Sequence, residues 1–520
     1  MESYIQPLAI ITGCLAVVHW LNSHIRDREA NPNGLPLPPG PKGLPIIGNL
    51  FDLPIFKPWL VYDNWFKVYG DMIYLNILGQ GILILGNLEK IHDIFEKRSN
   101  NYSDRPPLTM LVDIMGWDLA MSTHRYGTWW RRHRRAFHEH FNPSAIKRYH
   151  HTQLNGARSF LRNLLKSPSE NIMEYIRLAF ASTITEAAYG IKIKSWEDEY
   201  VKLAKEALRG VSEAAVPGAF LVDVFPVMKY IPAWFPGAKW RRKGDNWAAI
   251  NVRVVNEPYD YVKQQMKEGK VVPSIAARFV ETLPEDMTPE QKEEEVIARH
   301  TCASAYLAGA DTTVSAVQTF FLAMCLYPEH QKKAQEELDA VLQGRLPEFG
   351  DRPFLPHVNA LVKETMRWQP VTPMGFGHTA SNADEYNGYY IPKGTLVMGS
   401  TWGILRDPEE FDKPEEFNPE RYLKDGKINQ AVRDPSVAAF GYGRRICPGR
   451  HFSDESLFSI IAHTLSVYDI RPGLDKNGNE AKIIPDYTSG LFSYPVHFPC
   501  RVIPRSKAAE ELILSTEFTE

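Results

Sequence analysis

A very long helical pattern constrains the fold of this chain more than any other feature. It begins with the sequence TPEQ at Thr288, a capping box with proline at the first helical position, and it runs to Tyr327, just before Pro328. At 1.5 Å per residue, its roughly 39 residues span about 58 Å. A helix of this length crosses a whole protein, so we expect a helix-dominated fold that packs around it.

The middle of this pattern departs from an ordinary apolar helix. Residues 305–313 read AYLAGADTT, a small and polar patch that contains a glycine. Glycine inside a helix costs about 1 kcal/mol relative to alanine. We therefore expect a close approach to the backbone at Gly309.

Composition and charge limit the classes of protein to which the chain can belong. Of its 520 residues, 44% are hydrophobic and 23% are charged, which are the proportions of a globular protein. The 59 basic and 62 acidic residues give a net charge of −3, which offers no field for attracting nucleic acid. Five scattered cysteines exclude a disulfide scaffold and a paired-cysteine zinc site, and they fit a reducing compartment.

Residues 51–510 form one predicted domain, because no linker or repeat interrupts them. Residues 71–86, DMIYLNILGQGILILG, hold two β-rich runs around Gly79 and Gly81, which predicts a hairpin. Most of the remaining chain is helical, and its last third alternates helices, proline-rich turns and short apolar runs. The expected class is mainly α (α+β), with small β-sheets and a C-terminal tail at 511–520.

The N-terminal residues 1–24 are predicted to anchor the chain in a membrane. No residue from Tyr4 to Leu21 is charged, and this length is close to the minimum for crossing a bilayer as a helix. A cleaved signal peptide would need a basic leader, whereas Glu2 stands here. Arg26 and Arg28 follow the segment and place the body in the cytosol. Residues 25–50 form a predicted hinge, in which LPLPPGPKGLPIIGNL at 35–50 is a stiff extended spacer.

The decapeptide FGYGRRICPG at residues 440–449 carries most of the functional information. Cys447 follows two glycines, which allow positive φ, and two arginines, whose charge favours a thiolate. The other cysteines lie in apolar runs, where cysteine is usually a small buried hydrophobe: Cys14, Cys302, Cys325 and Cys500. A nucleophile, a phosphate-binding loop and a metal thiolate are the three candidate uses. A nucleophile needs a positioned His base and a phosphate loop needs no cysteine, whereas coordination of haem iron explains every part of the loop.

The loop resembles the haem-binding signature FxxGxRxCxG of the cytochrome P-450 family, matched at Phe440, Gly443, Arg445, Cys447 and Gly449. The resemblance implies that Cys447 ligates the iron of haem b and that the other four residues help to bind the haem. It extends over essentially the whole chain. It therefore implies the P-450 fold, a helix-rich single catalytic domain with small sheets and an N-terminal transmembrane helix.

Three further residues match family positions that bind haem propionates. Trp130 and Arg134 fit the WxxxR element within YGTWWRRHRR, although a basic helix face that meets an acidic redox partner is the alternative for this segment. His378 lies where the family often supplies another propionate partner. The preceding residue here is Gly377, where proline is commoner.

Glu364 and Arg367 match the ExxR motif, and Arg421 lies in PERY, which corresponds to the family's PERF element. Alone, this spacing is weak, because Glu206 and Arg209 share it on an ordinary helix. The resemblance implies that the three residues build a buried charge-paired triad that supports the cysteine loop.

Asp311 and Thr312 match the family's oxygen-activating pair. A threonine inside a helix usually bonds back to a carbonyl one turn earlier, which we expect of Thr313. Beside Gly309 the turn can open, so we expect Thr312 to remain free to bind dioxygen and a water, with Asp311 as the link to solvent. The pair favours true oxygen activation over peroxide rearrangement.

The resemblance implies a monooxygenase that uses O2 and NADPH and places one oxygen atom in an unactivated C–H bond. No flavin or nicotinamide domain is visible, so the electrons come from a separate NADPH-cytochrome reductase, with cytochrome b5 as a further candidate donor. With the anchor, this predicts a single-pass protein of the endoplasmic reticulum membrane whose catalytic domain faces the cytosol.

By analogy with the family, four largely apolar segments line the substrate pocket: 108–119, the long helix near Tyr306 and Ala310, 371–376, and 490–492. Residues 216–240 either dip into the membrane or form a core-packing connection. The substrate is expected to be a lipophilic small molecule. The chain resembles fungal, basidiomycete enzymes of secondary metabolism, which favours a terpenoid or polyketide.

Several alternatives stay open at this point. The substrate could be an aromatic amine such as an indole. The same fold also supports a haem-thiolate isomerase, dehydratase or peroxygenase that needs no reductase. A non-catalytic, membrane-tethered binding protein would have no use for the cysteine, the acid-alcohol pair and the triad together.

Overall fold

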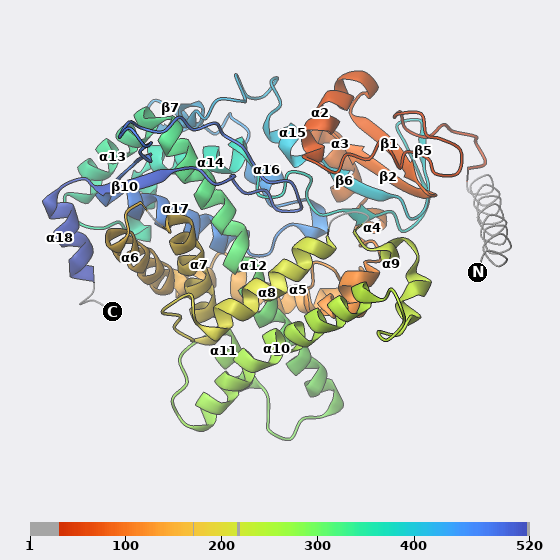
Figure 1. Cartoon of the computed structure of the whole chain (residues 1–520), viewed down its shortest axis with the longest axis horizontal. Coiled ribbons are helices and arrows are strands. Elements are labelled where there is room, and N and C mark those ends of the chain that lie inside the picture. The colour runs from red at the N-terminus through yellow and green to blue at the C-terminus, as the bar shows by residue number, and fades with distance from the viewer. Residues whose placement is uncertain (1–30, 170, 216–218, 517–520) are drawn as a thin grey trace. The chain divides into compact units, whose positions relative to one another are not determined.

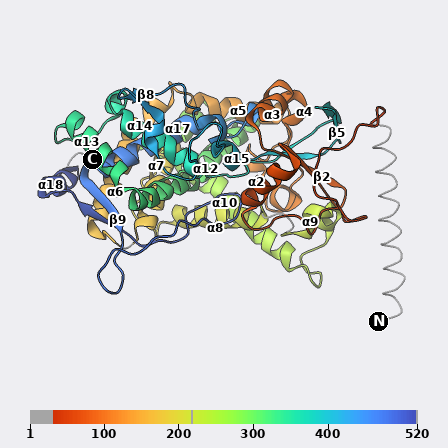
Figure 2. The same ribbon diagram turned by 90° about the horizontal axis from the view of Figure 1, so that it is seen from above.

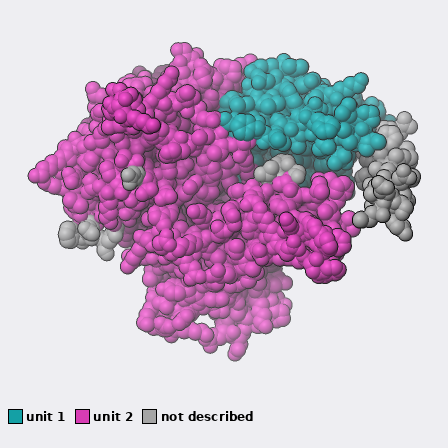
Figure 3. Space-filling view, in the orientation of Figure 1, with its two compact units in different colours: residues 1–106, 374–404, 442–445 teal, residues 107–373, 405–441, 446–520 magenta. Residues whose placement is uncertain are grey.

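The computed structural model describes residues 31–169, 171–215 and 219–516. The chain divides into two compact units (Figure 3), one of residues 1–106, 374–404 and 442–445 and the other of the remainder. Residues 51–510, predicted as one domain, contribute to both units, and the segments of the first unit form a sheet with its own small apolar core. The predicted anchor at 4–21 lies outside the described residues. Among the helices that the structure describes, none has both the length and the hydropathy to cross a bilayer.

The first unit is built on a four-stranded sheet of order β1-β2-β6-β3. Its strands are β1 (Met72–Ile77), β2 (Gln80–Leu85), β6 (Leu396–Gly399) and β3 (His378–Thr379). The predicted hairpin is confirmed by the antiparallel β1–β2 pair, whose turn has positive φ at Leu78 and Gly79. Gly81 lies within β2 opposite Asn76. The parallel β2–β6 pair then joins the hairpin to a segment more than 300 residues later in the chain.

Short elements complete this unit. They are α2 (Pro58–Tyr69), α3 (Leu88–His92), η2 (Asp93–Lys97), α4 (Ser99–Tyr102), β4 (Asp384–Tyr386), β5 (Tyr389–Ile391), η9 (Gly443–Arg445) and residues 401–404 of α15 (Thr401–Leu405).

The described part of the predicted hinge packs on this unit. Pro39 O accepts the N–H of Tyr74 at 2.8 Å, and Pro36 O accepts the N–H of Tyr390 at 2.9 Å. A Cβ at Gly40 would lie 2.1 Å from the carbonyl oxygen of Tyr74, so only glycine fits there. Residues 31–50 are therefore a docked segment rather than a free-standing spacer.

The second unit is mainly helical (Figures 1 and 2). Its longer helices are α5 (Thr128–Phe141), α6 (His150–Lys166), α7 (Ile172–Tyr189), α8 (Glu199–Ala214), α10 (Lys239–Lys267), α12 (Pro289–Leu326), α13 (Pro328–Leu342), α14 (Pro356–Trp368) and α17 (Arg450–Val467). Shorter helices are η3 (Thr109–Ile114), η4 (Trp117–Leu119), η5 (Ile146–Tyr149), α9 (Leu221–Val224), η6 (Pro226–Tyr230), α11 (Ile275–Thr282), η7 (Phe349–Phe354), η8 (Pro419–Tyr422), α16 (Ser436–Ala439) and α18 (Lys507–Ser515). Two strand pairs accompany them, β7 (Leu423–Lys424) with β8 (Lys427–Ile428) and β9 (Tyr468–Pro472) with β10 (Cys500–Pro504).

Helix α12 confirms the predicted long helix. Both bonds of the capping box between Thr288 and Gln291 are present, and the helix covers 38 residues. The figures show α12 beside α7, and it also packs on α5, α10 and α17. Its residues up to Ala310 belong to one apolar core and its residues from Val314 onward to another, so the polar patch lies where the two cores meet.

Two further predictions can be compared with the second unit. The predicted tail boundary at 511 falls inside α18, whose Ile513 is buried against the core. In the predicted membrane-dipping segment, Val222 is buried, but Val227, Tyr230 and Trp234 are all more than 70% exposed. Most described apolar side chains of this segment therefore do not pack into the core.

Candidate active site

The cysteine loop holds its thiol in a half-buried position in the second unit. The N–H of Cys447 donates to Phe440 O at 2.8 Å, which closes the loop. Burial raises the pKa of Cys447, while the N–H of Gly449 and the cations Arg134 and Arg450 act in the opposite direction. The other cysteines that the structure describes are fully buried. Burial is the larger effect, so the free sulfur is a neutral thiol, and the N–H and the two cations would support a thiolate once a metal is bound.

Residues 442–445 of the same loop belong to the first unit, where η2 holds them. Gly443 has φ 57°, and a Cβ there would lie 2.2 Å from Phe95 O, so glycine is required. Its N–H donates to Glu96 Oε1 at 3.0 Å. The ring of Tyr442 stacks on Phe95 with centroids 5.7 Å apart.

The first unit gathers two buried guanidinium groups. Arg445 donates from Nε to Ser103 O at 2.8 Å, and Arg105 donates from Nη1 to Gly377 O at 2.7 Å. Burial and the charge of Arg445 lower the pKa of Arg105 to about 9, although Asp104 opposes this shift. Buried like charges favour the binding of an anionic ligand. The sequence analysis missed Arg105, because nothing in the letters around it signals burial.

His378 lies beside these arginines as a neutral ring. Its Nδ1 lies 2.6 Å from Tyr102 O and so carries the proton, because a carbonyl only accepts. Burial, Arg105 and Arg445 hold the pKa of His378 well below its usual value. Its neutral Nε2 cannot donate to a carboxylate. Of the two, Arg105 is therefore the better carboxylate donor.

Trp130 and Arg134 lie one turn apart on α5 in the second unit. Trp130 is buried, and Arg134 is half-buried and close enough to Cys447 to favour its thiolate. Their neighbour Arg132 has another role, since it pairs with Glu293 at 2.6 Å and with Glu294 at 2.7 Å. Of the arginines of α5, Arg134 thus lies near Cys447, whereas Arg131 and Arg135 are exposed.

The predicted close approach at Gly309 is to a neighbouring helix. A Cβ at Gly309 would lie 2.7 Å from Ile184 Cγ1 on α7. The adjacent Ala308 is exposed although the turn before it is buried. The middle of α12 thus packs tightly against α7 at Gly309 and leaves Ala308 exposed.

The bond to a carbonyl one turn earlier, predicted for Thr313, is made by Thr312 instead. Thr312 Oγ1 donates to Ala308 O at 2.9 Å, and α12 continues without opening. Thr313 lies 3.0 Å, oxygen to oxygen, from Ser453 on α17. The correction has a simple cause: the glycine is used for packing against α7, so it does not unwind the turn that would free Thr312.

Asp311 has a partner that the sequence did not indicate. Its carboxylate accepts the hydroxyl of Tyr494, and the guanidinium of Arg177 lies 5.8 Å from the ring of that tyrosine. Burial and the carboxylate raise the pKa of Tyr494. The predicted link to solvent, Asp311, is thus paired with Tyr494, which comes from a loop more than 180 residues away in sequence.

The three triad residues meet in the second unit. Arg367 forms two parallel bonds to Glu364, of 2.7 and 2.8 Å, and Arg421 Nε lies 3.2 Å from the same carboxylate. Arg367 also donates to Leu405 O at 3.0 Å and to Pro414 O at 2.9 Å. These bonds fix the segment 405–421, and α16, which precedes the cysteine loop, packs on the same helix α14.

The second unit also brings together several predicted substrate-lining residues. Met110, Leu111, Ile114 and Trp117 lie in one apolar core with Tyr306 and Ala310. The hydroxyl of Tyr306 donates to Tyr200 O, so the apolar face of its ring remains in this core. Val371 O accepts the N–H of Ser493, next to the predicted segment 490–492.

These residues fit a haem. Among the described cysteines, Cys447 is the one that is not fully buried, and its thiol, with N–H and guanidinium support, would suit a ligand of haem iron. Within the first unit, the buried Arg105 and Arg445 have the charge that a carboxylate such as a propionate needs.

Comparison with known proteins agrees with this chemistry. The cytochrome P450 family model matches residues 38–484. Cytochrome P450 monooxygenase COX2 of Coprinopsis cinerea is 46% identical over 484 residues, which cover 93% of this chain and 92% of the relative. COX1 of the same organism is 42% identical over 511 residues, 97% of this chain and 98% of the relative. Tryptamine 4-monooxygenase of Psilocybe cyanescens is 40% identical over 504 residues, 96% of this chain and 97% of the relative.

The chain therefore belongs to the cytochrome P450 family of monooxygenases. This confirms the family predicted from the cysteine loop. Membership of the family implies haem as cofactor and O2 as a substrate.

Proposed function

We propose that this enzyme hydroxylates a lipophilic small molecule of fungal secondary metabolism, a terpenoid or polyketide, with electrons from NADPH passed through a separate reductase. The observation that carries the proposal is the half-buried Cys447 in its N–H-lined and arginine-lined loop. The apolar core around Met110 and Trp117 supports a lipophilic substrate. The fungal monooxygenases that the chain resembles support the pathway class.

The residues have separate tasks in this proposal. Cys447 ligates the iron, and Arg105, Arg445 and Arg134 bind the propionates, with Trp130 beside them. When bound, haem supplies the reductive activation of O2. Thr312 supplies a hydroxyl for proton delivery, for which it exchanges its bond to Ala308 O for one to a water. Asp311 and Tyr494 hold the next proton.

An acidic reductase is the proposed electron donor, with cytochrome b5 as a second one. Arg131 and Arg135 of α5 are exposed, while Arg132 is occupied by its two glutamates. Exposed arginines of this kind steer an acidic partner toward the protein surface. They lie on the helix that carries Arg134, close to Cys447.

Co-expression of the full chain with a reductase tests the proposal. We expect NADPH-dependent products that gain the mass of one oxygen atom, and a strongly red-shifted Soret band for the reduced protein under carbon monoxide. Cys447→Ser should abolish both. Thr312→Ala should lower product per NADPH and release peroxide, whereas Thr313→Ala, whose hydroxyl bonds Ser453, should keep coupling close to wild type. Full turnover without reductase, driven by peroxide alone, would instead identify a peroxygenase or isomerase.

We further propose that the enzyme works at the endoplasmic reticulum membrane, facing the cytosol. Val227, Tyr230 and Trp234 form an exposed apolar group around η6, where side chains of this type suit the membrane interface. Changing all three to serine should reduce co-flotation of an N-terminally truncated protein with vesicles at least severalfold. Phe354→Ser, at an equally exposed phenylalanine on η7, is the control and should leave flotation unchanged. Equal flotation of both variants would contradict the membrane role of this group.

An aromatic amine is the second candidate substrate, favoured by the 40% identity to tryptamine 4-monooxygenase. The two candidates can be separated directly. The reconstituted enzyme is given tryptamine in one series and uncharged terpenoid hydrocarbons in another. Hydroxylated tryptamine alone would establish the amine, and oxidised terpenoid alone would establish the principal proposal.

A further inference from the structure

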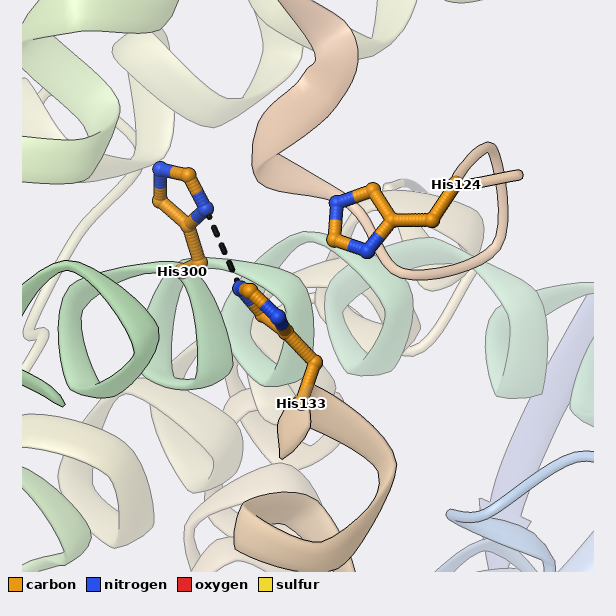
Figure 4. Close-up of side chains that lie close together, drawn as sticks. All are labelled: His124, His133 and His300. Atoms are coloured by element: carbon orange, nitrogen blue, oxygen red, sulfur yellow. Dashed lines mark hydrogen bonds between the residues drawn. The ribbon is translucent and has the colours of Figure 1, made fainter. Parts of the chain in front are cut away.

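Three histidine rings converge in the second unit (Figure 4). His124 comes from the loop between η4 and α5, His133 from α5, and His300 from α12. One ring nitrogen of each lies within 4.8 Å of the others. His124 and His133 are buried, and His300 is half-buried. Three separate segments therefore place imidazole nitrogens around one point.

The hydrogen bonds of two rings fix their tautomers. His124 Nε2 lies 2.5 Å from Asp118 O, and His133 Nδ1 lies 3.0 Å from Trp129 O. Since a carbonyl only accepts, each of these nitrogens carries the proton of its neutral ring. The lone pair of His133 is then on Nε2, the nitrogen that faces His300. A backbone carbonyl on the opposite nitrogen is the usual support of a metal-binding histidine.

The separation of the other nitrogens matches a tetrahedral ion. His133 Nε2 and His300 Nδ1 are 3.3 Å apart. Two histidine nitrogens at about 2.05 Å from a tetrahedral Zn²⁺ are also about 3.3 Å apart. In the metal-free protein His300 Nδ1–H donates to His133 Nε2, and on binding an ion His300 would carry its proton on Nε2 instead, so the ring stays neutral.

The charges around the rings permit a cation. Burial lowers the pKa of His133 to about 3 and of His300 to about 4, so both rings are neutral near pH 7. Asp118 lies close enough to His300 to oppose that shift. The nearby cation Arg132 is offset by its ion pairs with Glu293 and Glu294. The ligands thus need no deprotonation before they bind a metal.

We propose that His124, His133 and His300 form a binding site for one divalent transition-metal ion, with Zn²⁺ the best match and water in the remaining position. Neutral imidazoles of this number and spacing are the donors that Zn²⁺ prefers. The ion would join α5 and the loop before it to α12. His300 precedes Thr312 by 12 residues, about 18 Å along the helix, so the ion is structural and separate from the oxygen chemistry.

Metal analysis of the untagged, haem-loaded enzyme tests this site. After dialysis against a chelator and return of Zn²⁺, mass spectrometry should find one zinc per chain. Zinc-edge X-ray absorption should show three imidazole nitrogens near 2.05 Å. Zinc should also raise the melting temperature by a few degrees, because it binds the folded chain and not the unfolded one.

Single variants His124→Gln, His133→Gln and His300→Gln should each weaken zinc binding at least about 100-fold, since changes outside the first shell already cost about 10- to 100-fold. His140→Gln, at another buried histidine of α5, is the matched control and should bind zinc like the wild type. If His133→Gln does not fold, the test relies on two other measurements. These are zinc binding by His300→Gln, which changes a half-buried residue, and the zinc-edge X-ray absorption spectrum of the wild type. Less than a tenth of an equivalent of zinc, or equal affinity in all four variants, would overturn the proposal.

Discussion

At the scale of single residues, the buried carboxylate of Glu364 is held by hydrogen bonds from three other residues. Its carboxylate is fully buried, and it receives two bonds from Arg367, one from Arg421 and the N–H of Asn418 at 2.7 Å. A buried carboxylate needs such partners, because taking a charge out of water costs several kcal/mol. The same guanidinium groups hold carbonyl oxygens of the segment 405–416, so the charge pair also fixes a loop.

We predict that Arg367→Leu lowers the free energy of unfolding by about 3–5 kcal/mol, because it leaves the buried Glu364 with too little compensation. Urea denaturation of the haem-loaded enzyme measures this loss. Arg209→Leu is the control: its exposed pair with Glu206 has the same sequence spacing, and its removal should cost about 0–1 kcal/mol. A similar loss of unfolding free energy in both variants would mean that burial does not determine how much an ion pair contributes to stability.

The role of a residue could be predicted where all the groups that define the role lie within one short segment. The loop 440–449 contains its thiol, glycines and arginines within ten residues, so its use could be inferred from the letters. Arg105 and Tyr494 could not be found in this way, because their importance comes from contacts with residues far away in sequence. The bond of Thr312 to a carbonyl one turn earlier was predicted for Thr313 instead, because it depends on whether a neighbouring helix uses Gly309.

At the scale of elements, the crossing of α7 and α12 requires a residue without a Cβ. Gly309 lies where Ile184 contacts the backbone of α12, and the two helices have the most extensive contact in the unit. The local cost of glycine in a helix, about 1 kcal/mol, is thus offset by tight packing. Asp311 and Thr312, the pair proposed for oxygen activation, follow directly in the sequence.

We predict that Gly309→Ala destabilises the enzyme by about 1–2 kcal/mol, because overpacking against Ile184 outweighs the gain in helix propensity. In an Ile184→Ala background the same change should become neutral or stabilising by up to about 1 kcal/mol. A double-mutant cycle from denaturation curves gives this coupling. Gly350→Ala, where an added Cβ meets nothing within 4 Å, is the control. Additive effects at 309 and 184 would refute the packing explanation.

Elements with signals in their own sequence could be predicted with nearly correct bounds. The capping box fixed the start of α12, and Gly79 marked the turn of the β1–β2 hairpin. The parallel pairing of β2 with β6 had no such signal, because it joins residues more than 300 positions apart. The docking of 31–50 onto Tyr74 and Tyr390 was missed for the same reason.

At the scale of the whole molecule, burial of neutral histidines makes the stability of the chain depend on pH. His140, His357 and His463 are buried in the second unit. Burial lowers the pKa of each to about 4, because the imidazolium form loses its hydration. In the unfolded chain they titrate near the ordinary value of about 6.5.

The direction of the pH dependence follows from the numbers of protons that the folded and the unfolded chain bind. Between pH 4 and 6.5 the unfolded chain binds more protons than the folded one, so the free energy of unfolding rises with pH over this range. The stabilisation is fully present above pH 6.5 and is lost as the pH falls toward 4. Each ring contributes about 1.4 kcal/mol for every unit by which its pKa is lowered.

We predict that the free energy of unfolding depends less steeply on pH in His463→Gln, because one of the buried imidazole rings is removed. Urea midpoints measured at pH 7.5, 5.5 and 4.5 give the slope for each variant. The exposed His497→Gln is the control and should keep the wild-type slope, because its ring is hydrated in both states. The wild type should lose stability mostly between pH 6 and 4, and His463→Gln should lose less over the same interval. Identical slopes for the two variants would show that burial of His463 does not drive acid unfolding, and the loss would then have to come from carboxylates that are paired only in the folded chain.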